Sequence, residues 1–303
     1  MIKKPYMNIT RREPSNTLPR TEVLTVQPKQ MAFPLLIIVT TPGLAKDQQP
    51  SPQLRGQVTL DGNWVGGTMA HLSNYLESDG DLPPTLQVAI GYPLDAAVGA
   101  SVARCRELTP TPWPEWDAIC AELIGIEVPP TGGADPFLCF INDELKPMLE
   151  QEFGVHPAQW TLVGHSLGGL FVLHALLSAP QCFRRYFAVG SSLWWRRPLM
   201  FDRAEAFVAA SGELDISVYL CAGGAETPDG YAQAWAPHLD RPAMQQYLRI
   251  MGGIPDVVSD TLRMGELLAR RPGCRTRTEI FECENHNGAP FVGFGRGLRW
   301  LCS

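Results

Sequence analysis

The sequence predicts an α/β fold in which helices cover both faces of a mostly parallel sheet. Short apolar runs alternate along the chain with longer stretches whose apolar residues recur at helical spacing. The later apolar runs are continuous rather than alternating, as strands covered on both faces require. With 303 residues, 45% of them apolar and 18% charged, the chain is long enough to bury one large core.

The expected strands follow one another along the chain at 22–27, 35–40, 57–61, 86–92, 160–164, 185–190, 215–222 and 276–283. The stretches with helical spacing lie between them, at 67–78, 136–153, 167–179, 201–212 and 254–271.

The sequence shows no linker or internal repeat that would divide it. Residues 1–20 are polar and are expected to be loosely attached. Residues 21–303 are expected to form a single domain. An insertion at about 100–136, bounded by runs rich in proline and glycine, is expected to cover one edge of the sheet.

Composition and charge narrow the range of partners. The net charge of -6 argues against nucleic acid as a partner, and an anionic ligand would need a local basic pocket. The apolar run 34–39 is too short to span a bilayer, which takes about 20 residues, and no secretory signal precedes it. A cytoplasmic protein without membrane contact is therefore expected. The eight cysteines form no C-x-x-C pair, so neither a metal site nor a cofactor is expected.

The segment from Trp160 to Leu176 fits a nucleophile elbow. A buried strand leads into the G-x-S-x-G turn around Ser166, and an apolar helix follows at once. The glycines of the turn leave room for close backbone approach, and the helix N-terminus favours developing negative charge. Ser166 is therefore predicted to be the nucleophile of an α/β-hydrolase. The alternative is a structural serine that caps the helix.

Six histidines could supply the base. His286 directly follows the last predicted strand and so falls at the same sheet edge as Ser166, which predicts that it is the general base. His174 lies on a largely apolar helix and is expected in the core. His165 adjoins the nucleophile, and its side chain is expected to point away from the Oγ of Ser166.

The acid that orients the histidine is expected after the seventh predicted strand, where Glu226 and Asp229 follow a Gly-Gly turn. Glu226 comes first and is preferred. Asp229, or a serine–histidine pair without an acid, stays open. The oxyanion donors are expected to be the backbone N–H of Leu167 and one from the loop after the third strand, supplied by Gly62 or Asn63.

Stretches beyond the elbow carry a resemblance to a known family, at 60–64, 104–110, 132–147, 162–176, 192–195 and 284–286. In these the chain resembles the siderophore esterase branch of the Putative esterase family, the enterochelin (enterobactin) esterase-like α/β-hydrolases related to esterase D. The resemblance covers most of the chain from about residue 20. It implies hydrolysis of ester bonds in macrolactone siderophores such as ferric or iron-free triscatecholates.

The resemblance also implies functional positions. Ser166 and His286 fall at the family's catalytic positions. The residues expected to contact substrate are Asp61, Arg104, His165, Trp194, Trp195 and Arg196. A ferric triscatecholate is anionic and aromatic, so arginine and tryptophan suit it, with Arg106 and Arg197 as further cations or ordinary surface charges. For Trp194 and Trp195, burial against the sheet edge stays open as the alternative to contact with substrate. Three stretches, "SSLWW", "ELTP" and "NGAPF", differ from the pattern of the family. They are expected around the pocket, so the exact substrate stays open.

The reaction expected is acyl transfer to water through an acyl-serine intermediate. Three alternatives stay open. The first is a thioesterase or acyltransferase acting on another secondary-metabolite ester. The second is an esterase for small esters, and the third is a binding module that has lost catalysis on a hydrolase scaffold.

Overall fold

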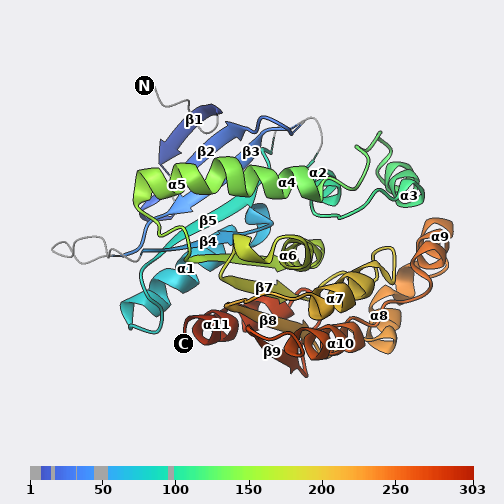
Figure 1. The fold of residues 1–303 in the computed structure, drawn as a ribbon. Helices are drawn as coiled ribbons and strands as arrows, with labels where there is room; N and C mark the ends of the chain where they lie inside the picture. The colour runs from blue at the N-terminus through green and yellow to red at the C-terminus, as the bar shows by residue number, and fades with distance from the viewer. Residues whose placement is uncertain (1–7, 15–17, 32, 44–53, 95–98) are drawn as a thin grey trace.

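A nine-stranded sheet forms the centre of the computed structural model, which describes residues 8–14, 18–31, 33–43, 54–94 and 99–303 (Figure 1). The strand order is β1-β2-β3-β5-β4-β6-β7-β8-β9, antiparallel from β1 to the β3–β5 pair and parallel from β5 to β9. The strands are β1 Asn8–Pro14, β2 Thr21–Gln27, β3 Leu35–Thr40, β4 Arg55–Thr59, β5 Thr85–Gly91, β6 Trp160–His165, β7 Arg185–Val189, β8 Ile216–Gly223 and β9 Cys274–Phe281.

All eight predicted strands are present, and β5, β7 and β8 are buried at every residue, as their continuous apolar sequences indicate. One strand was not predicted. Residues 8–14, expected to be loosely attached, form β1 and pair antiparallel with β2. Arg12 ties this polar edge strand to the body through ion pairs with Glu22 and Glu152 at 2.9 and 2.6 Å. Apolar periodicity could not reveal it, because most of its residues are polar and exposed and it is held by backbone pairing with β2.

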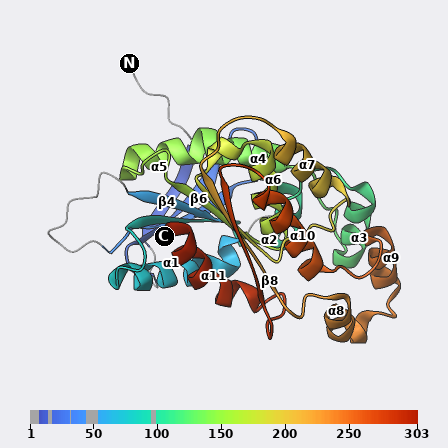
Figure 2. The ribbon, with the colours of Figure 1, turned by 60° about the horizontal axis from the view of Figure 1, so that its bottom comes forward.

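Helices cover both faces of the sheet (Figure 2). Helices α1 and α11 pack on one face, and α4 to α7 and α10 lie on the other. The α-helices are α1 Gly62–Ser78, α2 Ala100–Glu107, α3 Pro114–Ile124, α4 Ala134–Phe140, α5 Lys146–Phe153, α6 Leu167–Ser178, α7 Leu199–Ala209, α8 Pro228–Trp235, α9 Pro242–Met251, α10 Val257–Ala269 and α11 Ala289–Cys302. A π-helical turn, Ile141–Leu145, joins α4 to α5. None of the helices in the described residues is long and apolar enough to cross a membrane.

The five predicted helical stretches all form helices, whereas α2, α3, α8, α9 and α11 were not predicted. The insertion predicted at 100–136 contributes α2 and α3. Helix α9, which comes after β8, packs against α3 through the rings of Tyr247 and Trp116, whose centroids are 4.8 Å apart (Figure 1). Two segments distant in sequence therefore lie together beside the sheet.

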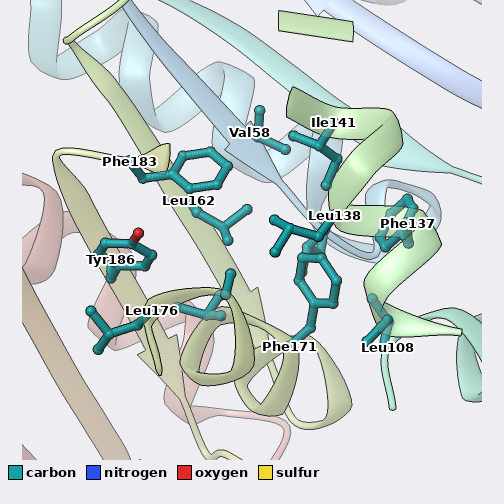
Figure 3. Packing of buried hydrophobic residues seen from close by; sticks show 14 of the residues in the cluster. Val58, Leu108, Phe137, Leu138, Ile141, Leu162, Phe171, Leu176, Phe183 and Tyr186 are labelled. Carbon is teal, nitrogen blue, oxygen red and sulfur yellow. The ribbon is translucent and has the colours of Figure 1, made fainter. Parts of the chain in front are cut away.

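Helix α6 is apolar on every side because it is enclosed between the sheet and α4. Its Phe171 meets Phe137 of α4 with ring centroids 5.1 Å apart (Figure 3). Val58 of β4 and Leu162 of β6 belong to the same cluster and are fully buried. Close packing of this kind holds a helix rigidly, which fixes the residue at its N-terminus. That residue is Ser166.

Candidate active site

Ser166 occupies a strained turn between β6 and α6. Its φ and ψ are 61° and -118°, a conformation that residues other than glycine rarely adopt and that concentrates at functional sites. The backbone N–H of Ser166 donates to the carbonyl of Val189 at 2.9 Å. A Cβ at Gly164 would collide with the backbone of Gly168, so the turn requires that glycine. The predicted strand–turn–helix arrangement is thus present around the serine.

His286 and Glu226 are brought together from separate segments. The Nδ1 of His286 lies 2.6 Å from the Oε2 of Glu226, whose side chain is fully buried. The same carboxylate accepts hydrogen bonds from the backbone N–H of Gly223 at 2.8 Å and from the hydroxyl of Tyr231 at 3.1 Å. Asp229, the other acid considered, is exposed in the first turn of α8. The carboxylate of Glu226 can therefore keep the proton of His286 on Nδ1 and leave Nε2 free to act as a base.

His165 is also part of this arrangement. Its Nε2 lies 2.8 Å from the backbone carbonyl of His286, and the two rings face each other with centroids 4.4 Å apart. Burial, and then the nearby charges of His286 and Arg104, lower the pKa of His165 well below its usual value of 6.5. The ring is therefore neutral, and Nε2–H is the donor in this bond. The side chain reaches the loop that carries the base.

Ser166 and His286 line one cavity of about 450 Å³, a volume typical of small-molecule sites. Within the described residues the Oγ of Ser166 contacts the Oγ of Ser192 at 3.5 Å and makes no hydrogen bond to His286. Catalytic hydrogen bonds of this kind often form fully only when substrate is bound. The cavity is lined by Asp61, Trp64, Val65, Ser101, Arg104, His165, Ser166, His286, Asn287, Pro290 and Phe291.

Arg104 and Asp61 form a two-pronged ion pair in the cavity wall. Nε and Nη2 of Arg104 donate to the two carboxylate oxygens of Asp61 at 2.7 and 2.8 Å. Burial alone would lower the pKa of Arg104, but the Asp61 carboxylate outweighs it and raises the pKa. The guanidinium therefore stays charged, yet Asp61 already neutralises it. Arg104 lies over the ring of Trp64, 5.8 Å from its centroid, and thereby supports the rim of the cavity.

The candidate oxyanion donors lie at two helix N-termini. Leu167 is the first residue of α6, and Gly62 and Asn63 begin α1, where backbone N–H groups have no acceptor within the helix. The side-chain amide of Asn63 is engaged elsewhere, since it exchanges hydrogen bonds of 2.8 and 2.7 Å with the backbone of Tyr92. These two hydrogen bonds hold the start of α1 against the end of β5. Both N-termini adjoin residues of the same cavity.

The structure does not bring the other predicted substrate residues to this cavity. Trp194 and Arg196 line a second cavity of about 840 Å³. Trp195 is fully buried, and its Nε1 donates to the Oγ1 of Thr111 at 3.2 Å, so it lies in the core, as the alternative of burial against the sheet edge has it. The segment after β7 turns toward α3, where Arg196 lies over the ring of Trp113. Because of that turn, Trp194 and Arg196 lie away from the cavity of Ser166, although the resemblance implied that they lie near the substrate.

Each of the two further arginines considered, Arg106 and Arg197, lies beside a carboxylate of the protein. Arg197 pairs with the buried carboxylate of Asp260, and Arg106 lies 3.8 Å from the carboxylate of Glu107.

Sequence reasoning missed two aromatic residues at the rim and one hydroxyl behind the acid. Trp64 and Phe291 line the cavity with 51% and 57% of their surface exposed. Trp64 stands beside Asn63 in the stretch that carried the resemblance, whereas Phe291 gave no signal beyond its closeness to His286. Tyr231 comes five residues after Glu226, and no spacing rule pointed to it. Exposed aromatic rings at a cavity mouth suit a bulky or aromatic ligand.

The chain is similar in sequence and in fold to known esterases. Residues 118–247 match the model of the family described as Putative esterase. The ferri-bacillibactin esterase BesA of Bacillus subtilis (strain 168) is 32% identical over 217 residues, which are 69% of this chain and 72% of that protein. The siderophore triacetylfusarinine C esterase of Aspergillus fumigatus is 40% identical over 122 residues, 40% of this chain and 38% of that protein. The solved structure of the siderophore hydrolase EstB from Aspergillus nidulans covers 96% of this chain and 97% of its own, with a TM-score of 0.73 and 25% identity. The predicted α/β-hydrolase fold is confirmed.

Proposed function

The chain belongs to the Putative esterase family, in its siderophore esterase branch, and from that premise we propose that Ser166 hydrolyses ester bonds of a macrolactone siderophore. The observation that carries the proposal is one cavity that holds Ser166 on its strained turn together with His286, whose Nδ1 is 2.6 Å from Glu226. A capping serine would need neither that backbone strain nor an oriented histidine beside it.

Each residue of the site has its own step in the proposed reaction. The Nε2 of His286 takes the proton of Ser166, and the Oγ attacks the ester carbonyl, whose oxygen gains the negative charge. The N–H of Leu167 and that of Gly62 or Asn63 hold this oxyanion. Protonated His286 then gives its proton to the departing alkoxide. A water molecule, deprotonated by the same Nε2, attacks the acyl-serine, and His286 returns that proton to the Oγ of Ser166 as the acid leaves.

The substrate class rests on the relatives and on the rim of the cavity. The named relatives are esterases for ferri-bacillibactin and for triacetylfusarinine C, two different siderophores. In this chain Trp64 and Phe291 offer exposed aromatic surface to the arms of such a molecule. Arg104 is the only arginine among the lining residues, and Asp61 neutralises it. Aromatic and apolar contact therefore carries recognition beside Ser166, more than charge does.

The test is mass spectrometry of the products after wild-type protein and Ser166→Ala are incubated with enterobactin, with and without ferric iron. Linear trimer, dimer or monomer should form with the wild type. Loss of the nucleophile should lower turnover by a factor on the order of 10⁶, by analogy with serine hydrolases of other folds. Equal product from Ser166→Ala would overturn the mechanism. Intact enterobactin together with fluorophosphonate labelling of Ser166 would leave the hydrolase and remove this substrate.

A further inference from the structure

A third cavity, polar and of about 590 Å³, lies at the opposite ends of the strands from Ser166. It is placed where β7, β8 and β9 begin, since Arg185, Ile216 and Cys274 are the first residues of those strands. Ser166 follows the last residue of the parallel strand β6 and so lies at the other ends of the strands. We call this third site the arginine cavity. Its polar lining residues are Arg184, Arg185, Asp215, Ser217, Arg271, Arg275 and Ser303.

Positive charge accumulates there in a protein whose net charge is -6. Among the lining side chains four are arginines and one is a carboxylate, that of Asp215, which is exposed and pairs with Arg184 at 2.5 Å. Burial, and then the charges of Arg55, Arg184 and Arg275, lower the pKa of Arg185 to about 10. Burial is the larger cause, and the like charges of the neighbouring arginines add to it.

Neutral groups hold these arginines in place. Nε and Nη2 of Arg185 donate to the carbonyl of Leu301 and to the side chain of Gln159 at 2.8 and 2.9 Å. Nη2 of Arg271 donates to the carbonyl of Gly212 at 3.0 Å. Such bonds fix the orientation of a guanidinium without reducing its charge.

Further nitrogens of the cluster have no protein partner. In the described part of the chain, Nη1 of Arg184, Nη1 of Arg185 and Nε of Arg271 are buried and make no hydrogen bond. A buried charged N–H without an acceptor costs free energy, and an anion beside it would offset that cost. The arginines are thus oriented, close together and short of negative charge.

We propose that the arginine cavity binds a small polyanion with phosphate-type oxygens. The fork of a guanidinium matches such oxygens with paired hydrogen bonds. The lining contains no aromatic ring, so the cavity offers charge and hydrogen-bond donors rather than apolar aromatic surface. The site lies apart from the cavity of Ser166 and does not depend on the function proposed for it.

The test is isothermal titration of sodium pyrophosphate and of inorganic phosphate into full-length wild-type protein and Ser166→Ala, against sodium chloride of equal ionic strength. Both proteins should bind one pyrophosphate with the same Kd, and their Tm should rise with its concentration. Arg184→Gln and Arg275→Gln, which change partly exposed side chains, should each raise the Kd about tenfold or more. Arg249→Gln, in the cavity of Trp194, is the matched control and should leave the Kd for pyrophosphate unchanged.

Two results would overturn the proposal. One is the absence of binding heat and of any Tm rise for the wild type at about 10 mM pyrophosphate. The other is a Kd that both arginine variants leave unchanged while circular dichroism shows them folded, since the anion would then bind elsewhere. Parallel ester hydrolysis assays should show no competition by pyrophosphate.

Discussion

The Nε2 of His165 lies 2.8 Å from the backbone carbonyl of His286, and the two imidazole rings face each other 4.4 Å apart. His165 immediately precedes Ser166 and ends β6, in the middle of the sheet. The residue before the proposed nucleophile thus holds the loop that carries the proposed base. A short turn after β9 is thereby hydrogen-bonded to the end of the central strand β6, beside the serine.

Removing that tie should slow the reaction with little effect on substrate binding. His165→Phe keeps a ring beside His286 and loses the N–H donor, so His286 should sample positions from which Nε2 cannot reach Ser166. We expect kcat to fall about tenfold or more with KM nearly unchanged, because misplaced catalytic groups are costly. Steady-state kinetics on an activated ester would measure this. His165→Gln, which keeps a donor, should recover part of the loss; equal losses in both variants would argue against the hydrogen bond.

The neutral state of His165 should make stability depend on pH. Its pKa is lowered in the folded protein, so below 6.5 the unfolded chain binds more protons and the free energy of unfolding falls as pH falls. The slope from this residue is at most about 1.4 kcal/mol per pH unit. Glu107, whose pKa burial raises to about 7, acts in the opposite direction. Urea unfolding of wild type and His165→Phe from pH 7 to 5 should therefore show a wild-type advantage that shrinks with acid; a constant difference would contradict the assignment.

The choice of acid can be settled with two matched variants. Glu226→Gln keeps the shape of the side chain but turns an amide toward Nδ1 of His286, which favours the wrong tautomer. We expect kcat to drop by a factor on the order of 10⁴, as for comparable changes in other serine hydrolases. Asp229→Asn changes an exposed carboxylate in the first turn of α8 and should leave kcat within about twofold of the wild type. If the larger loss occurred in Asp229→Asn, the loop would rearrange during catalysis.

A variant of Tyr231 tests how the carboxylate of Glu226 is held in position. Its hydroxyl donates to Oε2 of Glu226 at 3.1 Å and lies 3.4 Å from Nδ1 of His286. Tyr231→Phe removes one of the hydrogen bonds that hold the carboxylate, while Gly223 still donates to the other oxygen. We expect kcat to fall about fivefold, with stability reduced by about 1 kcal/mol, the usual value of one such bond. An unchanged kcat would mean that Gly223 alone positions the acid.

The sequence could predict β5, β7 and β8 because they are continuous apolar runs, and it could predict the elbow because a tight turn needs glycine. The positions of Ser166, Glu226 and His286 followed from the order of strands in this fold, and their roles stay proposals. Trp195 shows where such reasoning fails, because a resemblance gives a position along the chain but not the direction of a side chain. The contacts of Tyr231 and His165 with His286 join distant segments, which only the folded chain reveals.

Helix α11 was missed for a reason that can be tested. Its glycines at 293, 295 and 297 lower helix propensity, yet a Cβ at Gly297 would collide with the ring of Phe187. Gly297→Ala should therefore destabilise the fold by about 1–3 kcal/mol through overpacking. At Gly295 the nearest atom to an added Cβ is 3.9 Å away, so Gly295→Ala should stabilise by about 0.5–1 kcal/mol through helix propensity alone. Urea denaturation of both variants measures the contrast. If both substitutions stabilised the protein, α11 would have room to move off the sheet, and close approach could not be the reason for glycine at position 297.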